Sequence, residues 1–341
     1  MKKHVTLQDI ADKLNISKVS VSKALRDHPD ISMETKQRIS AAAQKMGYMP
    51  NFIARNLSSR QSNTIGLVVP KIAHHFFASA IEAIYQTANL NNYEIIMTVS
   101  QEDAAHEAKH IQTLLSMRVD GLLVSVTEQT KDRAIFELVK KRGTPLVFFD
   151  RVIEGIGFST VTNDDEKGTY LAIKKMIQSG YTRIAHLAGY SHSNIGYNRR
   201  KGFELAAKEC KLKIPDYWII EGGFGEEDGY EGFMTLYNKG DLPEVIFAVT
   251  YPVALGIQLA AQEVGVKIPD KLEIISFGGS IYNRFISPSI TYINQPINEL
   301  GAKAIELIID EIKNPDTVQD QHITLPTELI ICETCKKMIG N

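Results

Sequence analysis

The sequence has few of the features that mark secreted, disulfide-stabilised or membrane-inserted proteins. Its 341 residues include three cysteines, so one thiol must stay unpaired, which is typical of a reducing compartment. No stretch approaches the ~20 apolar residues of a membrane helix, and the lysines after Met1 lead into no apolar signal segment. We therefore expect a cytoplasmic protein without a membrane partner.

The sequence also lacks the motifs of common catalytic and cofactor sites. It contains no G-x-S-x-G, no Walker loop and no H-E-x-x-H, and the glycine-rich run 222–225 has no nucleotide-binding fingerprint. Cys332 and Cys335 form a C-x-x-C, which could bind a metal or exchange disulfides. A zinc site needs about four ligands, however, so an inert strand end is the alternative. We expect no enzyme activity, no cofactor and no metal.

Charge is distributed unevenly along the chain. Residues 1–60 contain eleven Lys and Arg against five Asp and Glu, whereas the other 281 residues contain twenty-seven against thirty-five. A basic head of net charge +6 therefore precedes an acidic body of net charge −8, although the whole chain carries −2. This asymmetry indicates that one end of the chain contacts nucleic acid.

The basic head predicts three short helices. Thr6 and Ser17 are suitable N-caps for the first two, and a third helix runs from about Ser32 to Gly47. Apolar residues at helical spacing supply their core: Leu7, Ile10, Ala11, Leu14, Val19, Val21, Ala24, Leu25, Ile39, Ala42, Ala43 and Met46. This pattern predicts a helix-turn-helix. The polar, cationic face of the second helix favours DNA binding over the alternative of a plain helical bundle.

Residues 49–63 predict a hinge. Pro50 suits the first turn of a helix of about two turns, well below the ~12–15 residues that are marginal alone in water. We expect this helix to form only when a second chain and DNA support it. Residues 58–63 follow as a polar linker.

Three stretches of the head and hinge resemble the lactose/galactose repressor family of bacterial transcriptional regulators: residues 6–11 (TLQDIA), 16–22 (ISKVSVS) and 47–57 (GYMPNFIARNL). The resemblance continues to the end of the chain and implies ten DNA-binding residues. Lys18, Val19, Ser22 and Lys23 would face bases, Thr6, Ser17, Ser20 and Asn51 would contact phosphates, and Arg55 and Leu57 would act from the hinge. Leu57 would enter the minor groove and bend the DNA, and Val19 suits contact with a thymine methyl.

The body alternates apolar runs with amphipathic helical patterns, which is typical of parallel sheets covered on both faces. The expected strands are 65–69, 94–99, 119–124 and 145–149, then, in a second series that begins near Thr160, 183–187, 218–220, 245–249 and 272–276. The expected fold is thus an all-α helix-turn-helix head and an α/β body of two doubly wound parallel-sheet lobes, like periplasmic binding proteins. A cleft should lie at the carboxyl ends of the strands.

We divide the chain into a DNA-binding domain (1–48), a hinge helix and linker (49–63) and an effector-binding and dimerisation domain (64–341). The first lobe takes about 64–161 and 292–323, and the second takes about 162–291 and 324–341. The strand 290–293 and the helix 300–312 should therefore cross back to the first lobe. The resemblance implies that the chain passes between the lobes three times.

The resemblance also implies an effector site in the cleft, formed by Phe76, Phe77, Asp150, Arg151, Arg199, Phe224, Tyr251 and Gly278. Core packing is the alternative for the two phenylalanines, and an adjacent pair such as His74 and His75 is more often loop surface than a metal site. Arg199 is the principal candidate, because a guanidinium at a cleft suits recognition of a carboxylate, a phosphate or vicinal oxygens.

Two positions depart from the family pattern. Tyr251 and Gly278 stand where carboxylates commonly accept hydrogen bonds from sugar hydroxyls or a base. Since Arg151 and Arg199 remain, we expect an anionic effector, such as a sugar phosphate or sugar acid, rather than a neutral sugar. Alternatively, other side chains supply the acceptors: Asn194, Asn198, Tyr251 or Asn283.

Together these features predict a sequence-specific transcriptional regulator, a repressor whose affinity for a near-palindromic operator is switched by a small-molecule effector. We expect a homodimer, and the sequence does not decide whether the effector weakens or strengthens DNA binding. A sugar-binding transport or sensor protein is one alternative, but it would need an export signal and would not carry this head. A sugar-metabolising enzyme is the other.

Overall fold

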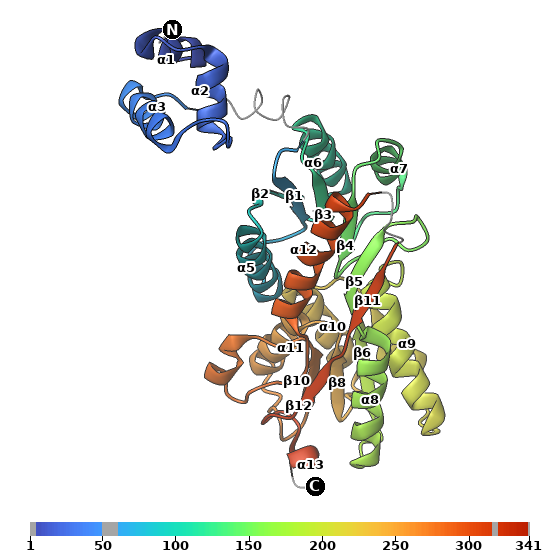
Figure 1. Cartoon of the computed structure of the whole chain (residues 1–341). Helices are drawn as coiled ribbons and strands as arrows, with labels where there is room; N and C mark the ends of the chain where they lie inside the picture. Colours follow the sequence, from blue (N-terminus) through green and yellow to red (C-terminus); the bar gives the residue numbers. More distant parts are fainter. Residues whose placement is uncertain (1–4, 50–60, 316–319, 340–341) are drawn as a thin grey trace. The chain divides into compact units, whose positions relative to one another are not determined.

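The computed structural model describes residues 5–49, 61–315 and 320–339 (Figure 1). The chain divides into two compact units, with the boundary between Ser62 and Asn63. The first unit contains the helical head and the second contains the α/β body, so the predicted fold class is confirmed. Within the described residues, every helix is too short or too polar to cross a membrane.

Over residues 5–49, the described part of the head contains three helices, which are α1 (Leu7–Leu14), α2 (Lys18–Leu25) and α3 (Met33–Met46). Thr6 caps α1 in a reciprocal capping box with Asp9, and Ser17 caps α2, both as expected; Ser32, where the third helix was expected to begin, caps α3. The α3 helix ends at Gly47, whose left-handed φ of 67° suits glycine. Short-range capping chemistry therefore determines where each of these helices begins and ends.

The core of the head shows which side of α2 remains available. Ile10, Val21 and Ile39 are fully buried where the three helices meet. Val19 is instead 65% exposed, so its prediction as a core residue was wrong. Two residues along a helix rotate the side chain by about 200°, which puts Val19 opposite Val21. Val19 thus lies on the outer face together with Lys18.

The first lobe contains a six-stranded, wholly parallel sheet in the order β11-β5-β4-β3-β1-β2. Its strands are β1 (Thr64–Val69), β2 (Glu94–Val99), β3 (Gly121–Val124), β4 (Leu146–Phe149), β5 (Ser159–Asn163) and β11 (His322–Leu325). Its helices are α5 (His75–Leu90), α6 (Ala104–Ser116), α7 (Ala134–Lys141) and α12 (Ile297–Lys313). The helices α5 and α12 pack on one face, and α6 and α7 pack on the other.

The second lobe contains a sheet in the order β12-β10-β9-β8-β6-β7, with β12 antiparallel to its neighbour. Its strands are β6 (Ile184–Ala188), β7 (Ile219–Glu221), β8 (Val245–Ala248), β9 (Glu273–Phe277), β10 (Thr291–Asn294) and β12 (Glu328–Ile330). Its helices are α8 (Asp165–Gln178), α9 (Asn194–Glu209), α10 (Glu226–Lys239), α11 (Tyr251–Glu263), α13 (Lys336–Ile339) and the 3-10 turns η1 (Asp216–Trp218) and η2 (Ile281–Phe285). Residues of α8 and α9 cover one face, and residues of α10 and α11 cover the other.

The chain passes between the two sheets three times, as the resemblance implies: from β5 to α8, from β10 to α12, and from β11 to β12 (Figure 1). The positions of these passages differ from the prediction. The strand expected at 290–293 does not cross, because β10 pairs with β9 and β12 in the second sheet. The strand β5 pairs with β4 in the first sheet, and β11, which ends at Leu325, pairs with β5 and forms the edge of that sheet.

The C-x-x-C pair lies beside the second sheet. Cys335 is fully buried in the core under α8 and α9, and burial raises the pKa of its thiol to about 12. Burial also raises the pKa of Cys332, and both cysteines are free thiols. A thiol with a raised pKa is a weak nucleophile and a weak metal ligand at neutral pH, which favours an inert structural role.

Candidate effector and DNA-binding sites

A cavity of about 340 Å³ lies between the lobes, at the carboxyl ends of the strands. All eight residues that the resemblance placed at an effector site line it: Phe76, Phe77, Asp150, Arg151, Arg199, Phe224, Tyr251 and Gly278. The lining also includes residues that the sequence did not single out, among them Glu226, Tyr282 and Gln295. The structure thus brings together positions that are up to about two hundred residues apart in the chain.

Aromatic rings form one wall of the cavity. Phe77 is 3% exposed and belongs to the core of the first lobe, and the ring of Phe76 meets it edge-on at 5.3 Å between centroids. Core packing and cavity lining, which were alternatives for this pair, therefore both apply. The guanidinium of Arg151 lies 5.8 Å from the Phe77 centroid and 5.0 Å from that of Phe224 in the other lobe.

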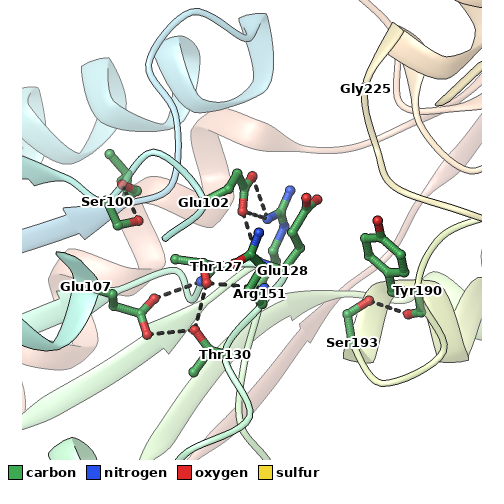
Figure 2. Close-up of polar contacts among 12 residues, drawn as sticks. Ser100, Glu102, Glu107, Thr127, Glu128, Thr130, Arg151, Tyr190, Ser193 and Gly225 are labelled. Carbon is green, nitrogen blue, oxygen red and sulfur yellow. Dashed lines mark hydrogen bonds and ion pairs between the residues drawn. The ribbon is translucent and has the colours of Figure 1, made fainter. Parts of the chain in front are cut away.

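Arg151 has a carboxylate partner that the sequence did not identify. Its Nη1 donates to both carboxylate oxygens of Glu102 at 2.9 Å, and both side chains are buried (Figure 2). Glu102 follows the carboxyl end of β2, the same edge of the sheet from which Arg151 follows β4. In the sequence, Glu102 is marked only by its position after an expected strand, and this position does not identify Arg151 as its partner.

Arg199 is similarly paired. Its Nε and Nη2 both lie 2.8 Å from Oδ1 of Asp165, and its Nη1 donates to the carbonyl oxygen of Val249 at 2.7 Å. The guanidinium carbon lies 3.8 Å from the centroid of Phe277, and the whole residue is 2% exposed. Asp165 was missed because it opens α8 directly after β5, a strand that the sequence did not reveal.

These two ion pairs weaken the charge argument for an anionic effector, although they do not test the effector itself. The cleft lacks two carboxylates that the family commonly carries, but Glu102 and Asp165 already compensate Arg151 and Arg199. The proposed substitute acceptors Asn194, Asn198 and Asn283 are also absent from the cavity lining. The hydroxyl of Tyr251 donates to Asn283 Oδ1 at 3.1 Å and so braces the second lobe.

Asp150 is one of two acidic residues in the described lining of the cavity, the other being Glu226. Its backbone adopts a left-handed φ of 59°, which is uncommon for a residue other than glycine. Burial raises the pKa of its carboxyl to about 7, against the opposing effect of Arg151 and Arg199. Near neutral pH this carboxyl can therefore donate or accept a hydrogen bond to a bound hydroxyl or amide.

A second buried carboxyl fixes the loop that follows β3. Glu107 accepts hydrogen bonds from Thr127 N at 2.7 Å and Thr130 Oγ1 at 2.8 Å, and burial raises its pKa to about 7 (Figure 2). In the same loop the amide of Glu128 donates to Glu102 Oε2 at 2.9 Å. The carbonyl of Glu128 lies 2.5 Å from Nε2 of His192 in the second lobe. The loop therefore connects the Arg151 ion pair to both lobes.

The structure describes seven of the ten predicted DNA-binding residues. Lys18 and Val19 are exposed on α2, Ser22 and Lys23 are half-buried beside them, and Thr6, Ser17 and Ser20 lie at the N-termini of α1 and α2. The hydroxyl groups of Ser17 and Ser20 are hydrogen-bonded to each other at 2.8 Å. Asn51, Arg55 and Leu57 lie outside the described residues. The exposed face of α2 thus carries donors and one apolar side chain in reach of a partner.

Two adjacent histidines form part of the cavity lining. His74 and His75 line the cavity, and burial lowers the pKa of both rings. Across the described ranges, no group of three or more His, Cys, Asp or Glu side chains is arranged to hold a metal ion. The pair is thus more consistent with a polar part of the cavity wall.

Comparison with known proteins gives a consistent result over the whole chain. The family described as "Periplasmic binding proteins and sugar binding domain of LacI family" matches residues 62–333, and "Bacterial regulatory proteins, lacI family" matches residues 6–51. The chain is 28% identical to Catabolite control protein A of Priestia megaterium over 98% of its length and 100% of that protein. It is 30% identical to the HTH-type transcriptional repressor PurR of Haemophilus influenzae, over 98% of this chain and 99% of that protein.

The structural similarity to known proteins also extends over nearly the whole chain. A crystal structure of the Lac repressor dimer bound to operator and the anti-inducer ONPF superposes with a TM-score of 0.85 at 22% identity, over 98% of this chain and 99% of that one. The fold of this chain therefore matches that of the Lac repressor over nearly its whole length. The chain belongs to the lacI family of bacterial regulatory proteins, which are DNA-binding transcriptional regulators with a ligand-binding body.

Proposed function

We propose that this regulator is a repressor that binds a near-palindromic operator as a homodimer in the cytoplasm, and that a small neutral molecule, most simply a sugar, switches its operator affinity. The observation that carries the proposal is the convergence of aromatic rings and compensated ion pairs on one cavity between the lobes. Relatives at about 30% identity that are named repressors, including a ribose operon repressor of Haemophilus influenzae, support the repressor role.

The neutral character of the ligand follows from the charges of the wall. Arg151 and Arg199 are each neutralised by a buried carboxylate, while Asp150 and Glu226 add no positive charge. An anion would therefore enter a cavity without an uncompensated cation, and desolvating it would be costly. The rings of Phe76, Phe224 and Tyr282 offer flat apolar surface to the C–H face of a sugar, and the polar groups between them can bond its hydroxyls.

A second copy of the chain is the partner that best fits the exposed apolar surface of the body. Leu90 is 84% exposed at the end of α5, and Ile281 and Phe285 are 57% and 73% exposed on η2. The first turn of α5 lies beside η2, because the rings of His75 and Tyr282 lie 6.2 Å apart, whereas Leu90 is at the other end of α5, about 22 Å along the helix. A twofold dimer would cover exposed apolar side chains of this kind and supply the two heads that the half-sites of a palindrome require.

The proposed switch acts through the hinge. Two hinge segments held side by side can form their short helices on DNA and insert Leu57, whereas separated segments cannot. Closure of the lobes around a ligand would change the spacing of these segments. A coupling of about 1–3 kcal/mol would change operator affinity about 5–150-fold, in a direction that the ligand titration reports.

The proposal is tested with the purified full-length chain. A duplex enriched from a randomised library by the protein serves as the operator, and fluorescence anisotropy measures its dissociation constant with neutral sugars, sugar phosphates and sugar acids. We expect one neutral sugar to change the constant at least fivefold. A response to a phosphate or acid alone would reject the neutral ligand. Sugar binding without any DNA binding would favour a transport or sensor protein, and consumption of the sugar would favour an enzyme.

A further inference from the structure

The helix α2, which carries the four residues proposed to face bases and is called the recognition helix below, has a lysine whose ammonium group is held by a carboxylate of the following loop. Lys23 Nζ lies 2.7 Å from Asp30 Oδ2, seven residues further along the chain. The two side chains are 36% and 57% exposed, so the pair lies at the surface of the head. His28 Nδ1 lies 3.3 Å from the same carboxylate oxygen.

Ser22 is held in a comparable way. Nε of Arg26 donates to the carbonyl oxygen of Ser22, and Nη2 donates to its hydroxyl, both at 3.1 Å. Two of the four side chains proposed to face bases therefore have partners in the chain before any DNA is bound. Lys18 and Val19, the other two, are exposed.

We propose that Asp30 is a specificity-determining residue of the DNA-binding head, because it holds the ammonium group of Lys23 over one base position and withholds it from backbone phosphates. This inference rests on the proposed operator binding. Asp30 would not contact a base itself; it positions Lys23.

Two properties of the pair support this role. A lysine ammonium is a compact charge on a flexible stem, and left free it adds to the salt-dependent attraction for phosphates that all DNA sequences share. A hydrogen-bonded carboxylate limits that freedom and offsets the charge. The bond from Lys23 also keeps the pKa of Asp30 below its usual value, so the carboxylate is ionised at neutral pH.

The same loop provides a matched control. Asp27 carries the same charge and is also paired with a lysine at 2.7 Å, but that lysine is Lys36 on α3. Asp27→Asn and Asp30→Asn therefore remove one negative charge each from the loop between α2 and α3. Only the second substitution releases a side chain of the recognition helix.

The experiment measures, for the full-length chain, the dissociation constants of the enriched duplex and of a scrambled duplex of equal length and composition. The specificity ratio is the dissociation constant of the scrambled duplex divided by that of the enriched duplex. We expect Asp30→Asn to tighten binding to the scrambled duplex and to lower this ratio about two- to fivefold, the range that an exposed ion pair can shift. Asp27→Asn should leave the ratio unchanged. In a Lys23→Ala background, Asp30→Asn should no longer change the ratio, since the coupling needs both partners.

The possible failures are distinct. If the wild-type chain does not prefer its enriched duplex, both the operator-binding function and the role of Asp30 are wrong. If it does prefer that duplex but the two asparagine variants give equal ratios, only the role of Asp30 is wrong. An effect of Asp30→Asn that persists in the Lys23→Ala background also overturns it, because the carboxylate would then act without the lysine.

Discussion

Asn194 of the second lobe donates from Nδ2 to the carbonyl oxygen of Asp150 in the first lobe at 2.9 Å. Its Oδ1 accepts a hydrogen bond from Val152 N at 3.1 Å, so one amide joins the two lobes twice. Asp150 also lines the cavity. One contact between the lobes and the wall of the cavity therefore share a residue, and we expect the lobe arrangement to affect ligand binding through it.

We expect Asn194→Ala to weaken binding of the switching ligand. Each lost hydrogen bond contributes about 0.5–1.5 kcal/mol, so two of them correspond to a change of roughly 5- to 150-fold in affinity. Calorimetric titration with the sugar found in the anisotropy screen measures it. Asn198→Ala, one turn further along α9 and outside the lining of this cavity, is the control and should bind normally. Equal affinities of the two variants would show that the amide does not stabilise the binding-competent arrangement.

Arg199 requires a double substitution to separate its two roles. Arg199→Ala should abolish the ligand response, but it also leaves Asp165 buried without a partner, which costs about 3–5 kcal/mol of folding free energy. Arg199→Met with Asp165→Asn removes both charges and should recover most of that stability in urea unfolding, while the ligand response stays lost. If the double variant still responds to the ligand, Arg199 is a structural residue only. In the absence of ligand, the double variant should still bind the operator.

The sequence predicted the elements that depend on near neighbours. The caps at Thr6 and Ser17 were predicted because a side-chain oxygen and the amide it accepts from are three residues apart. The apolar strands were also predicted from near neighbours, because a strand that is buried on both faces has several consecutive apolar residues. The resemblance supplied the effector positions, and the structure places all eight in one cavity lining.

Pairings between distant segments were not accessible from the sequence. The strand β10 was assigned to the wrong lobe because nothing local distinguishes a partner in one sheet from a partner in the other. The strand β5 reads Ser-Thr-Val-Thr-Asn and lacks an apolar run. The carboxylates of Glu102 and Asp165 lie 49 and 34 residues from their arginines, so the cleft seemed more positive than it is.

The two buried carboxyls predict a pH dependence of stability. In the folded chain Asp150 and Glu107 have pKa values of about 7, above the 3.8 and 4.5 of exposed groups. Well below pH 3.8 both groups are protonated in the folded and in the unfolded chain, and as the pH rises towards 7 the unfolded chain loses these protons first. Stability should therefore fall by about 1.4 kcal/mol per pH unit for each group and level off above pH 7.

Urea unfolding of the full chain between pH 5 and 8 checks this dependence as a difference between variants. Asp150→Asn and Glu107→Gln should each flatten the decline relative to the wild type. Glu209→Gln is the control, because the hydrogen bond from Lys174 lowers the pKa of Glu209 and its titration lies below this range. Parallel curves for all four proteins would mean that the two buried groups ionise normally in the folded chain.

Val19 and Val21 make opposite predictions although they are two residues apart. Val21 is fully buried, so Val21→Ala should destabilise the head by about 1–3 kcal/mol, whereas Val19 is 65% exposed and Val19→Ala should leave its stability unchanged. If Val19 contacts a thymine methyl, replacing each thymine of the enriched duplex by uracil in turn should weaken wild-type binding at one position per half-site. Val19→Ala should be insensitive to that replacement. A wild-type protein that binds every uracil duplex as tightly as the original would exclude the methyl contact. Val19 would then be an exposed residue without a role in base recognition.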